Sequence, residues 1–277
     1  MQFSKWHGLG NDFVIINGMK EPVTDYRRQA LAVCNRHVGI GADGLVVILP
    51  SAIADFKMRI FNSDGSEADM CGNATRCVAR YLYENRVTDK TVITLDTLAG
   101  IITPELLFAD GKLVTVRVDM GEPKFKRAEI PAAGNPEEQA VNIPFTVADK
   151  TYQITALSMG NPHCLIFVDD IHAVNLPLIG PKIETHDFFP RKTNVEFLQI
   201  IDRQTIRMRV WERGAGITMA CGTGASAALV AAVLNGYTDR KATVKLDGGD
   251  LFIEWASNNH IYKSGPAVEV FRGEYLL

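Results

Sequence analysis

The sequence lacks the features that mark several classes of protein. It has only five cysteines, an odd number without C-x-x-C spacing, so neither a disulfide framework nor a zinc or other metal site is predicted. It also has no run of lysine and arginine, and its formal net charge is -3. A protein with this charge pattern is poorly suited to follow a phosphate backbone, so we expect no nucleic-acid partner.

Long apolar runs are missing as well. No apolar stretch reaches the length of a membrane span, and the first residues do not pair a charged segment with an apolar one as a signal peptide does. We therefore expect a cytoplasmic protein without a membrane partner. Apolar residues make up 47% and charged residues 22% of the 277 residues, which is typical of a globular protein with one large domain or two smaller ones.

The chain contains an internal repeat with an offset of 150 residues. Residues 58–89 and 208–239 align without a gap and share seven identical positions, where ordinary amino-acid usage predicts about two. The Gly-Asn pair at residues 10–11 returns at residues 160–161. These matches indicate a duplicated domain; the alternative is a chance similarity between two ordinary strand-helix segments. The identical pairs are Met58/Met208, Arg59/Arg209, Cys71/Cys221, Gly72/Gly222, Asn85/Asn235, Thr88/Thr238 and Asp89/Asp239.

The residue pattern predicts an α+β fold. Short segments rich in β-branched and aromatic residues are separated by Gly, Asn, Asp and Pro turns, which is typical of strands. Helical character is confined to residues 25–37 and to the segments that follow Cys71 and Cys221. We expect two pseudo-symmetric domains, each a curled mixed or antiparallel sheet around a central helix. The expected strands are residues 13–17, 44–49, 57–62, 91–97, 113–121, 154–159, 163–170, 193–201, 205–212, 242–247 and 251–256.

The boundary between the halves is expected in residues 120–139, which are rich in proline, glycine and charge. We expect an N-terminal half-domain of residues 1–118 and a C-terminal half-domain of residues 119–262. The last segment, residues 263–277, is expected to pack with the N-terminal half-domain.

Cys71 and Cys221 each stand at the expected start of a helix, with a good N-cap residue, Asn73 or Thr223, two positions later. The unpaired N–H groups and partial positive charge of a helix start attract a carboxylate and lower the pKa of a thiol. A two-fold relation between the halves would bring both thiols to one cleft. Inverting a stereocentre beside a carboxylate needs such a pair, because one group removes a proton from one face and the other delivers a proton to the opposite face.

The sequence resembles the diaminopimelate epimerase family over essentially its whole length. The motifs that carry the resemblance occur in that family's order and spacing: HGLGNDF (7–13), NSDGSEADMCGNATRC (62–77), GNPH (160–163), TNVEF (193–197) and VWERGAGITMACGTGASA (210–227). The resemblance implies epimerisation of L,L-diaminopimelate to meso-diaminopimelate by a thiolate and a thiol, without a cofactor, in the biosynthesis of lysine and of peptidoglycan precursors. It also implies a homodimer.

The resemblance further implies a role for individual residues. Cys71 and Cys221 are then the two catalytic bases, and His163 and Glu212 shift the pKa values of the thiols in opposite directions. Arg213 can hold a carboxylate through two parallel N–H bonds. The implied substrate-binding residues are Asn11, Asn62, Gly72, Asn73, Asn161, Asn194, Glu212, Arg213, Gly222 and Thr223.

Several of these residues also have an ordinary structural explanation. An asparagine before a proline, as at Asn161, is typical of a turn; Glu212 and Arg213 could form an exposed ion pair; and His163 could be a core histidine. Gly44 departs from the family, which often has a substrate-binding glutamine at that position. We interpret the remaining cysteines as structural: Cys34, Cys77 and Cys164.

Three other functions are alternatives. A proline or hydroxyproline racemase uses the same pair of thiols, but its substrate lacks the second ammonium and carboxylate that the asparagines, Glu212 and Arg213 suit. A non-catalytic amino-acid-binding protein has no need of two helix-start cysteines. A thiol redox protein normally has a resolving cysteine nearby, whereas these two cysteines are 150 residues apart.

Overall fold

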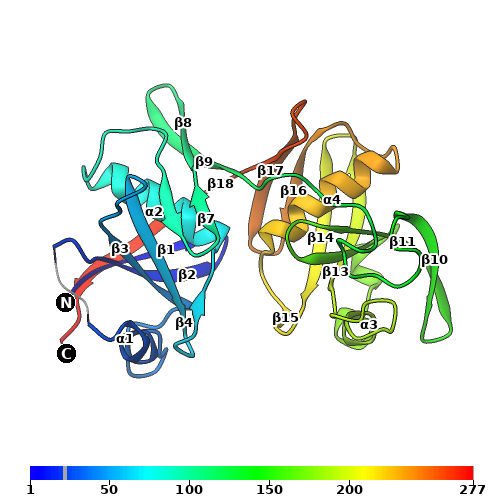
Figure 1. Ribbon diagram of the computed structural model, residues 1–277, viewed down its shortest axis with the longest axis horizontal. Coiled ribbons are helices and arrows are strands. Elements are labelled where there is room, and N and C mark those ends of the chain that lie inside the picture. Colours follow the sequence, from blue (N-terminus) through cyan, green and yellow to red (C-terminus); the bar gives the residue numbers. More distant parts are fainter. Residues whose placement is uncertain (21–23, 277) are drawn as a thin grey trace. The chain divides into compact units, whose positions relative to one another are not determined.

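The structure, a computed structural model, describes residues 1–20 and 24–276 and divides into two compact units (Figure 1). Unit 1 comprises Met1–Asp119 and Ser264–Leu277, of which Leu277 lies outside the described residues, and unit 2 comprises Met120–Lys263. The half-domains expected from the repeat, residues 1–118 with 263–277 and residues 119–262, stay a prediction. We propose that the two units are these half-domains.

Unit 1 contains, within its described residues, a mixed sheet, a hairpin and two helices. Its elements are β1 (Gln2–Gly8), β2 (Asn11–Asn17), α1 (Tyr26–Val33), β3 (Gly44–Leu49), β4 (Phe56–Asn62), β5 (Glu67–Ala68), α2 (Gly72–Glu84), β6 (Leu95–Thr97), β7 (Gly100–Ile102), β8 (Glu105–Ala109), β9 (Lys112–Asp119) and β19 (Val268–Glu274). The strand order is β19-β1-β2-β3-β4-β6-β7, with β5 paired to β4 and with β8 and β9 forming the hairpin.

Unit 2 contains a larger mixed sheet. Its elements are β10 (Ala140–Val147), β11 (Lys150–Ser158), β12 (Pro162–Phe167), the 3-10 helix η1 (Ile171–Ala173), α3 (Leu176–Glu184), β13 (Asn194–Asp202), β14 (Thr205–Glu212), β15 (Gly216–Ile217), α4 (Gly222–Leu234), β16 (Lys241–Leu246), β17 (Gly249–Trp255) and β18 (Ile261–Gly265), whose last two residues belong to unit 1. The strand order is β10-β11-β12-β13-β14-β16-β17-β18, with β15 paired to β14.

The two units repeat one order of elements. The run β1, β2, α1, β3, β4, β5, α2, β6, β7 corresponds to the run β11, β12, α3, β13, β14, β15, α4, β16, β17. The parallel pairs correspond too, since β2 with β3 and β4 with β6 match β12 with β13 and β14 with β16. The prediction of an α+β fold with two related halves is confirmed.

The central strands of unit 1 are apolar on both faces because helices cover both faces. Phe13 and Ile15 of β2 pack in the cluster that includes residues of α2, whereas Val14 and Ile16 pack in the cluster that includes Ala30 and other residues of α1. Since successive side chains of a strand point to opposite faces, a doubly covered strand needs a continuous apolar run. This explains why residues 13–16 lack the alternation of polar and apolar residues that a half-exposed strand has.

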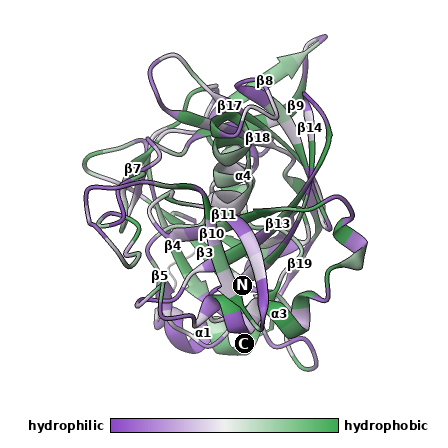
Figure 2. Ribbon diagram, turned by 90° about the vertical axis from the view of Figure 1, so that its right-hand side faces the viewer, coloured by the Kyte–Doolittle hydropathy of each residue, from purple (hydrophilic) through white to green (hydrophobic). Residues whose placement is uncertain are grey.

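Helix α4 lies inside the curled sheet of unit 2. It contacts β11, β12, β13, β14, β16 and β17, and residues 224–232 are all buried. Figure 2 shows this helix with the hydrophobic stretches of its strands in green. The run of alanines keeps the helix narrow, so the strands can approach it from several sides at the density of a protein interior. In the described part of the chain, no helix is long and apolar enough to cross a membrane.

Some elements escaped the sequence-based prediction. The expected strands all overlap observed strands, but residues 91–94 precede β6 instead of belonging to it. Helix α3 was missed because Pro181 stands inside it, and proline usually argues against a helix interior. The first and last strands of the chain, β1 and β19, were also missed, and they pair with each other across more than 250 residues of sequence.

The packing of α4 leads to a prediction about stability. Replacing Ala228, which is fully buried in the helix, with leucine should lower the free energy of unfolding by about 1–3 kcal/mol, because the added carbons have no space among the surrounding strands. Urea denaturation measures this difference. The matched control is Ala52→Leu at an exposed position, which should change the free energy of unfolding by less than about 0.5 kcal/mol. Equal effects of the two substitutions would contradict the tight packing around α4.

Candidate active site

Both cysteines of the repeat are the N-cap residues of their helices. Cys71 precedes α2 with an extended backbone (φ -139°, ψ 115°), and Cys221 precedes α4 in the same way (φ -110°, ψ 110°). The prediction that Asn73 and Thr223 are the N-caps is therefore wrong, since both residues lie in the first helical turn. Each helix does begin at its cysteine, as expected, because the cysteine carbonyl already accepts an N–H bond from the residue four positions later.

In unit 1, Cys71 lies beside two asparagines that the sequence singled out. The Cys71 thiol donates to Asn11 Oδ1 at 3.6 Å, and Asn73 Nδ2 donates to the same oxygen at 3.1 Å. Asn73 is buried, while Asn11 and Cys71 are half-buried. The structure thus gathers Asn11, Asn73 and the sulfur at the start of α2.

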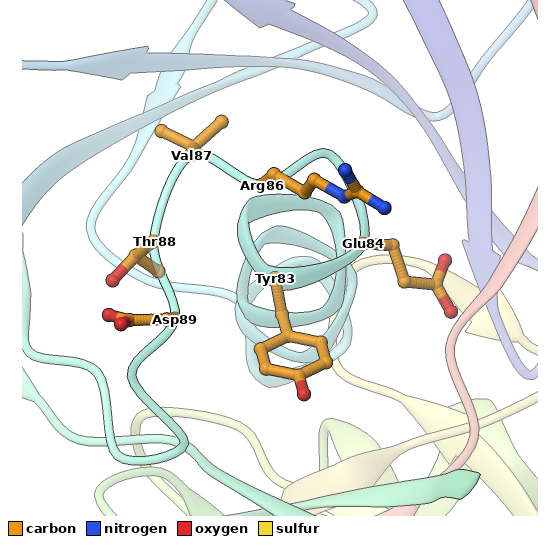
Figure 3. A pocket seen from close by; sticks show the side chains of 6 residues that line it. All are labelled: Tyr83, Glu84, Arg86, Val87, Thr88 and Asp89. Atoms are coloured by element: carbon orange, nitrogen blue, oxygen red, sulfur yellow. The ribbon is translucent and has the colours of Figure 1, made fainter.

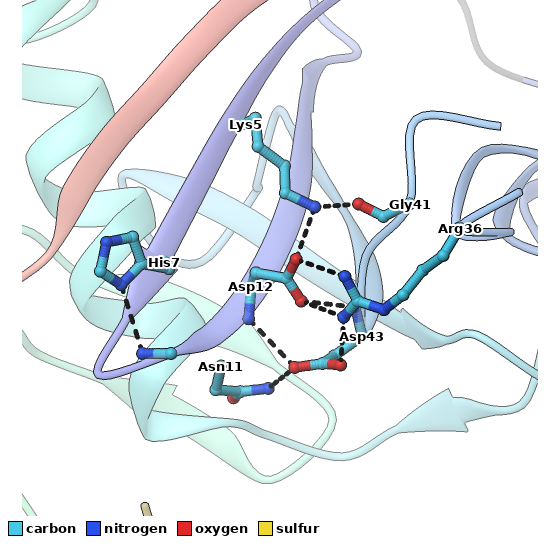
Figure 4. A network of polar contacts seen from close by, with 8 residues as sticks. Lys5, His7, Asn11, Asp12, Arg36, Gly41 and Asp43 are labelled. Atoms are coloured by element: carbon cyan, nitrogen blue, oxygen red, sulfur yellow. Dashed lines mark hydrogen bonds and ion pairs between the residues drawn. The ribbon is translucent and has the colours of Figure 1, made fainter. Parts of the chain in front are cut away.

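A network of charges lies beside the turn that carries Asn11 (Figure 4). Arg36 donates to both carboxylate oxygens of Asp12, at 3.0 and 2.7 Å, and to Asp43 at 2.8 Å. The ammonium of Lys5, which is almost fully buried, pairs with Asp12 at 2.7 Å. Burial by itself would raise the pKa of Asp12, but the bonds from Arg36 and Lys5 outweigh burial and hold that pKa well below its usual range.

Asn62 and Gly44 lie opposite each other on neighbouring strands of unit 1. The exposed Asn62 side chain donates to Ser66 Oγ at 2.9 Å and so belongs to the turn after β4. A Cβ atom at Gly44 would lie 2.9 Å from the carbonyl oxygen of Phe61. A glutamine at Gly44 would therefore require the backbone of β4 to shift.

In unit 2, the sulfur of Cys221 contacts two polar groups of the first turn of α4. The Gly224 N–H donates to Sγ at 3.3 Å, and the Thr223 hydroxyl lies 3.5 Å from Sγ. Cys221 is only 4% exposed, and Gly222 at the first helical position accepts from Ser226 Oγ at 3.0 Å. The sulfur itself thus caps α4, which the side chain of Cys71 does not do for α2.

Burial changes the acidity of Cys221 in the direction opposite to that expected. Burial raises the pKa of the Cys221 thiol well above its usual range, and the nearby carboxylates of Glu212 and Glu196 raise it further. The bonds from Thr223 and Gly224 lower the pKa only in part. The prediction that a helix start lowers this thiol pKa is wrong for the structure described here, because desolvation of the thiolate outweighs the helix start.

His163 connects a buried carboxylate to the start of α4. Its Nδ1 lies 2.6 Å from Glu196 Oε1, and its Nε2 lies 2.9 Å from Asn161 Oδ1. The amide nitrogen of Asn161 donates to Thr223 Oγ1 at 3.3 Å. His163 is thus a buried core histidine, but hydrogen bonds through Asn161 and Thr223 connect it to the sulfur of Cys221.

Glu196 is a residue that the sequence analysis did not single out. It is fully buried, one of its oxygens lies on His163, and the other has no hydrogen-bond partner within the described chain. A Cβ atom at Gly224 would lie 2.7 Å from Glu196 Oε1 and 3.2 Å from the sulfur of Cys221, so the carboxylate lies close to the thiol. Burial raises the pKa of Glu196, against the opposing effect of His163. The available signal was a glutamate inside the apolar strand segment TNVEFL, where a charge requires a partner.

Asn194, Glu212 and Arg213 meet where β13 and β14 lie side by side. Asn194 Nδ2 donates to the Pro162 carbonyl at 2.9 Å, and Asn194 Oδ1 accepts from the Arg213 backbone N–H at 2.9 Å. Glu212 accepts from the Thr218 hydroxyl, and the exposed Arg213 guanidinium donates to the Arg191 carbonyl at 3.3 Å. Glu212 and Arg213 thus have separate hydrogen-bond partners, Thr218 and Arg191.

The remaining cysteines lie in the cores. Burial raises the pKa of Cys34 to about 12 and that of Cys77 to about 12, and it raises that of Cys164 well above its usual value. Thiols of this kind are unreactive. Among residues 1–20 and 24–276, no group of three or more His, Cys, Asp and Glu side chains could hold a metal ion.

A cavity of about 620 Å³ lies at the far end of α2 from Cys71 (Figure 3). The residues that line it belong to the last turn of the helix and the loop that follows: Tyr83, Glu84, Arg86, Val87, Thr88 and Asp89. Because this cavity is at the opposite helix end, it is separate from the group around Cys71.

Comparison with known proteins gives matches over the whole chain. The family described as diaminopimelate epimerase matches residues 3–126 and 155–270. A relative named diaminopimelate epimerase from Pelotomaculum thermopropionicum is 58% identical over 277 residues, covering 99% of each chain. Relatives with the same name from Heliobacterium modesticaldum and Methanococcus maripaludis are 56% and 53% identical, each over 99% of both chains.

Solved structures share the fold at low sequence identity. A PhzF-family phenazine biosynthesis protein from Bacillus anthracis has a TM-score of 0.71 at 16% identity, covering 100% of this chain and 99% of the other. A probable proline racemase from Agrobacterium radiobacter has a TM-score of 0.69 at 17% identity, covering 100% and 93%. At such identities, these likenesses concern the fold alone.

The buried carboxylate beside Cys221 leads to a prediction. Replacing Glu196 with glutamine should lower the pKa of Cys221, because one of the negative charges that disfavour its thiolate is removed. The measurement is the rate of Cys221 alkylation as a function of pH, followed by peptide mass spectrometry; its midpoint should move to lower pH. Glu138→Gln, which changes an exposed carboxylate of the same unit, is the matched control and should leave the midpoint in place. An unchanged midpoint in the Glu196 variant would show that this carboxylate does not act on the thiol.

Proposed function

Since this chain belongs to the diaminopimelate epimerase family, we propose that Cys71 and Cys221 interconvert L,L- and meso-diaminopimelate as a pair of acid and base groups, without a cofactor. The activity serves the biosynthesis of lysine and peptidoglycan precursors. The observation that carries the assignment of the two residues is that cysteines at equivalent positions of the repeat are the N-caps of equivalent helices. Two such groups are what the inversion of one carbon atom needs.

In this proposal, each turnover moves one proton off the α-carbon and one proton onto it. The thiolate of one cysteine takes the α-hydrogen, and the thiol of the other delivers its proton to the opposite face, so the two cysteines exchange protonation states. Exchange of protons with water, or the reverse reaction, restores the starting states of the two cysteines. Burial and two nearby carboxylates favour the protonated form of Cys221, which supports its use as the proton donor at one stage.

The reacting carboxylate is assigned to the helix starts. Gly72 and Asn73 begin α2, and Gly222 and Thr223 begin α4, so their backbone N–H groups lie among the unpaired donors of the first turn. Such donors stabilise the negative charge that develops on the carboxylate when the α-proton leaves. This charge is the main obstacle in the reaction, because an α-hydrogen is very weakly acidic.

The far end of the substrate carries a second ammonium and a second carboxylate. We assign Arg213 to that carboxylate and Glu212, Asn11, Asn62, Asn161 and Asn194 to the remaining polar groups. Arg213 suits this role because its guanidinium is exposed while its backbone is fixed by Asn194. His163 and Glu212 are assigned to the control of the thiol pKa values, which the bonds of His163 to Glu196 and Asn161 support.

A solvent-isotope experiment tests the proposed chemistry. With L,L-diaminopimelate in deuterated water under reducing conditions and without added cofactor, the native protein should place deuterium at the α-carbon. Replacing Cys71 or Cys221 with serine should reduce the rate of exchange at least about 100-fold, because a hydroxyl is too weak an acid to replace the thiol. Nuclear magnetic resonance of the α-position measures the rate.

The control is Cys34→Ala, a buried cysteine of unit 1 outside the proposed pair, which should keep the exchange rate. Absence of exchange with the native protein would refute the proposed reaction. Racemisation of proline under the same conditions would instead support the activity named for the fold relative from Agrobacterium. Exchange that survives in both serine variants would refute the assignment of the thiols.

We also propose that the protein works in the cytoplasm, where its thiols stay reduced, and as a homodimer that uses the outer strand β19. This strand ends the described sheet of unit 1, and its side chains Val268, Val270 and Phe271 are exposed. An edge strand with exposed apolar side chains is suited to pair with a second chain.

The dimer proposal predicts the effect of a charge on β19. Replacing Val270, which is 55% exposed, with lysine should shift the protein toward the monomer in sedimentation velocity, because the lysine would place a charge in the interface. The matched control is Val114→Lys on β9, where valine is 49% exposed, and it should leave the assembly unchanged. A native protein that sediments as a monomer at all concentrations would contradict the proposal.

A further inference from the structure

A chain of hydrogen bonds runs through unit 1 from a buried arginine to a carboxylate. Arg76 Nη2 donates to Asn73 Oδ1 at 2.9 Å, and Asn73 Nδ2 donates to Asn11 Oδ1 at 3.1 Å. Asn11 Nδ2 then donates to Asp43 Oδ2 at 2.8 Å (Figure 4). This series of hydrogen bonds therefore includes Asn11, which contacts the Cys71 thiol, and Asn73, which lies two residues after Cys71.

The two ends of this chain determine the direction of every bond in it. A guanidinium has only donors, and an ionised carboxylate has only acceptors. Arg76 therefore requires the oxygen of Asn73 to face it, and Asp43 requires the amide nitrogen of Asn11 to face it. Because the amide nitrogen of Asn11 faces Asp43, the amide oxygen of Asn11 must face Asn73 and Cys71.

Neighbouring groups hold both ends in place. Arg76 is fully buried, and its other nitrogens donate to the Pro266 carbonyl and the Gly72 carbonyl, each at 3.2 Å. Asp43 Oδ2, the oxygen that Asn11 contacts, also accepts from the Asp12 N–H at 3.1 Å, while Arg36 contacts the other oxygen at 2.8 Å. Neither the Arg76 guanidinium nor Asp43 Oδ2 can therefore turn without breaking a hydrogen bond to a backbone group.

The corresponding asparagine of unit 2 is held the other way round. Asn161 matches Asn11 in the repeat, yet its nitrogen faces Thr223 at the helix start and its oxygen faces His163. Arg76 and Asp43, the two ends of the hydrogen-bond chain in unit 1, have no counterpart in unit 2. At the equivalent positions of the repeat, unit 2 has Ser226 and Thr193. At the same offset of 150 residues, unit 2 has His163 where unit 1 has Phe13.

We propose that Asp43 and Arg76 are positioning residues of the reaction, which hold the amide of Asn11 so that its oxygen stays directed at the Cys71 thiol. An oxygen at that place accepts the S–H bond of Cys71, which an amide N–H in the same place could not do. The surroundings of the two sulfurs of the repeat therefore differ, because Cys71 faces an acceptor and Cys221 faces the N–H donor of Gly224. The proposal depends on the proposed function in one respect, because it takes Cys71 to be a catalytic thiol.

Alkylation of the cysteines by iodoacetamide at a fixed pH, quantified by peptide mass spectrometry, tests the role of Asp43. Replacing Asp43 with alanine removes the acceptor that holds Asn11, so the thiol loses its directed partner. We expect Cys71 to react about 2- to 10-fold faster, the range that one modest hydrogen bond supports, while the rate at Cys221 stays the same. An unchanged rate at Cys71 would overturn the proposal.

Two variants separate the bond to Asn11 from the charge network. Arg36→Gln removes the ion pairs of Arg36 with Asp12 and Asp43, but Asp43 Oδ2, which faces Asn11, is still held by the Asp12 N–H. The Arg36 side chain is 56% exposed, so the fold should persist. Asp43→Asn combined with Arg36→Gln removes both charges, and without Arg36 the new amide oxygen is drawn to the donors on Asn11 and Asp12. Both should retain the native rate at Cys71. Acceleration in either one equal to that of Asp43→Ala would attribute the effect to charge and overturn the proposal.

A further test uses the native protein, so its result does not depend on whether a substituted protein folds. Neutron diffraction from deuterated crystals locates the deuterons of Asn11, and we expect both on the nitrogen that faces Asp43. Deuterons directed at Cys71 would overturn the proposal. Neither this experiment nor alkylation uses turnover, so their failure is distinct from a failure of the solvent-isotope experiment that tests the proposed function.

Discussion

Each cysteine of the pair ends an extended segment and begins a helix that is buried along most of its length. The position of the sulfur is therefore set by the packing of thirteen helical residues in each unit, not by the loop in front of it. Moving either sulfur would require moving a helix whose neighbours fill the core at the density of a protein interior. The proposed acid and base groups are rigid for this reason, and reactions that move protons depend on such geometry.

The helix start by itself does not determine the acidity of the thiol. At Cys221, burial and two carboxylates raise the pKa against the favourable effect of the N–H donors. Both units present their cysteine on the same frame of strands and helix, but the polar groups around it differ. Unit 2 has His163 and Glu196 where unit 1 has Phe13 and Val46, and unit 1 has Asp43 and Arg76 where unit 2 has Thr193 and Ser226. The duplication thus preserved the frame, while the surroundings of the two sulfurs diverged.

The sequence predicted much of this frame because its signals are local. The strands follow from β-branched runs between turn residues, and the repeat from matches at one offset. The prediction failed where the decisive contact is distant in sequence. Helix α3 contains a proline, yet it forms because it packs on β14, where Gly180 lies against the Trp211 ring with no space for a side chain. Strands β1 and β19 lie at opposite ends of the chain, so neither predicts the other.

The sequence by itself determined the family, and for the site it predicted the two cysteines together with asparagines, a histidine and a glutamate, because these residues stand in motifs of a specific order. Only the tertiary structure decided which residue caps each helix, that Glu196 lies beside Cys221, and that Asp43 and Arg76 direct the amide of Asn11. The physical reason is that burial and hydrogen-bond direction depend on groups from separate strands and helices. Spacing along the chain predicts which residues take part, but the acidity of a thiol depends on what surrounds it in space.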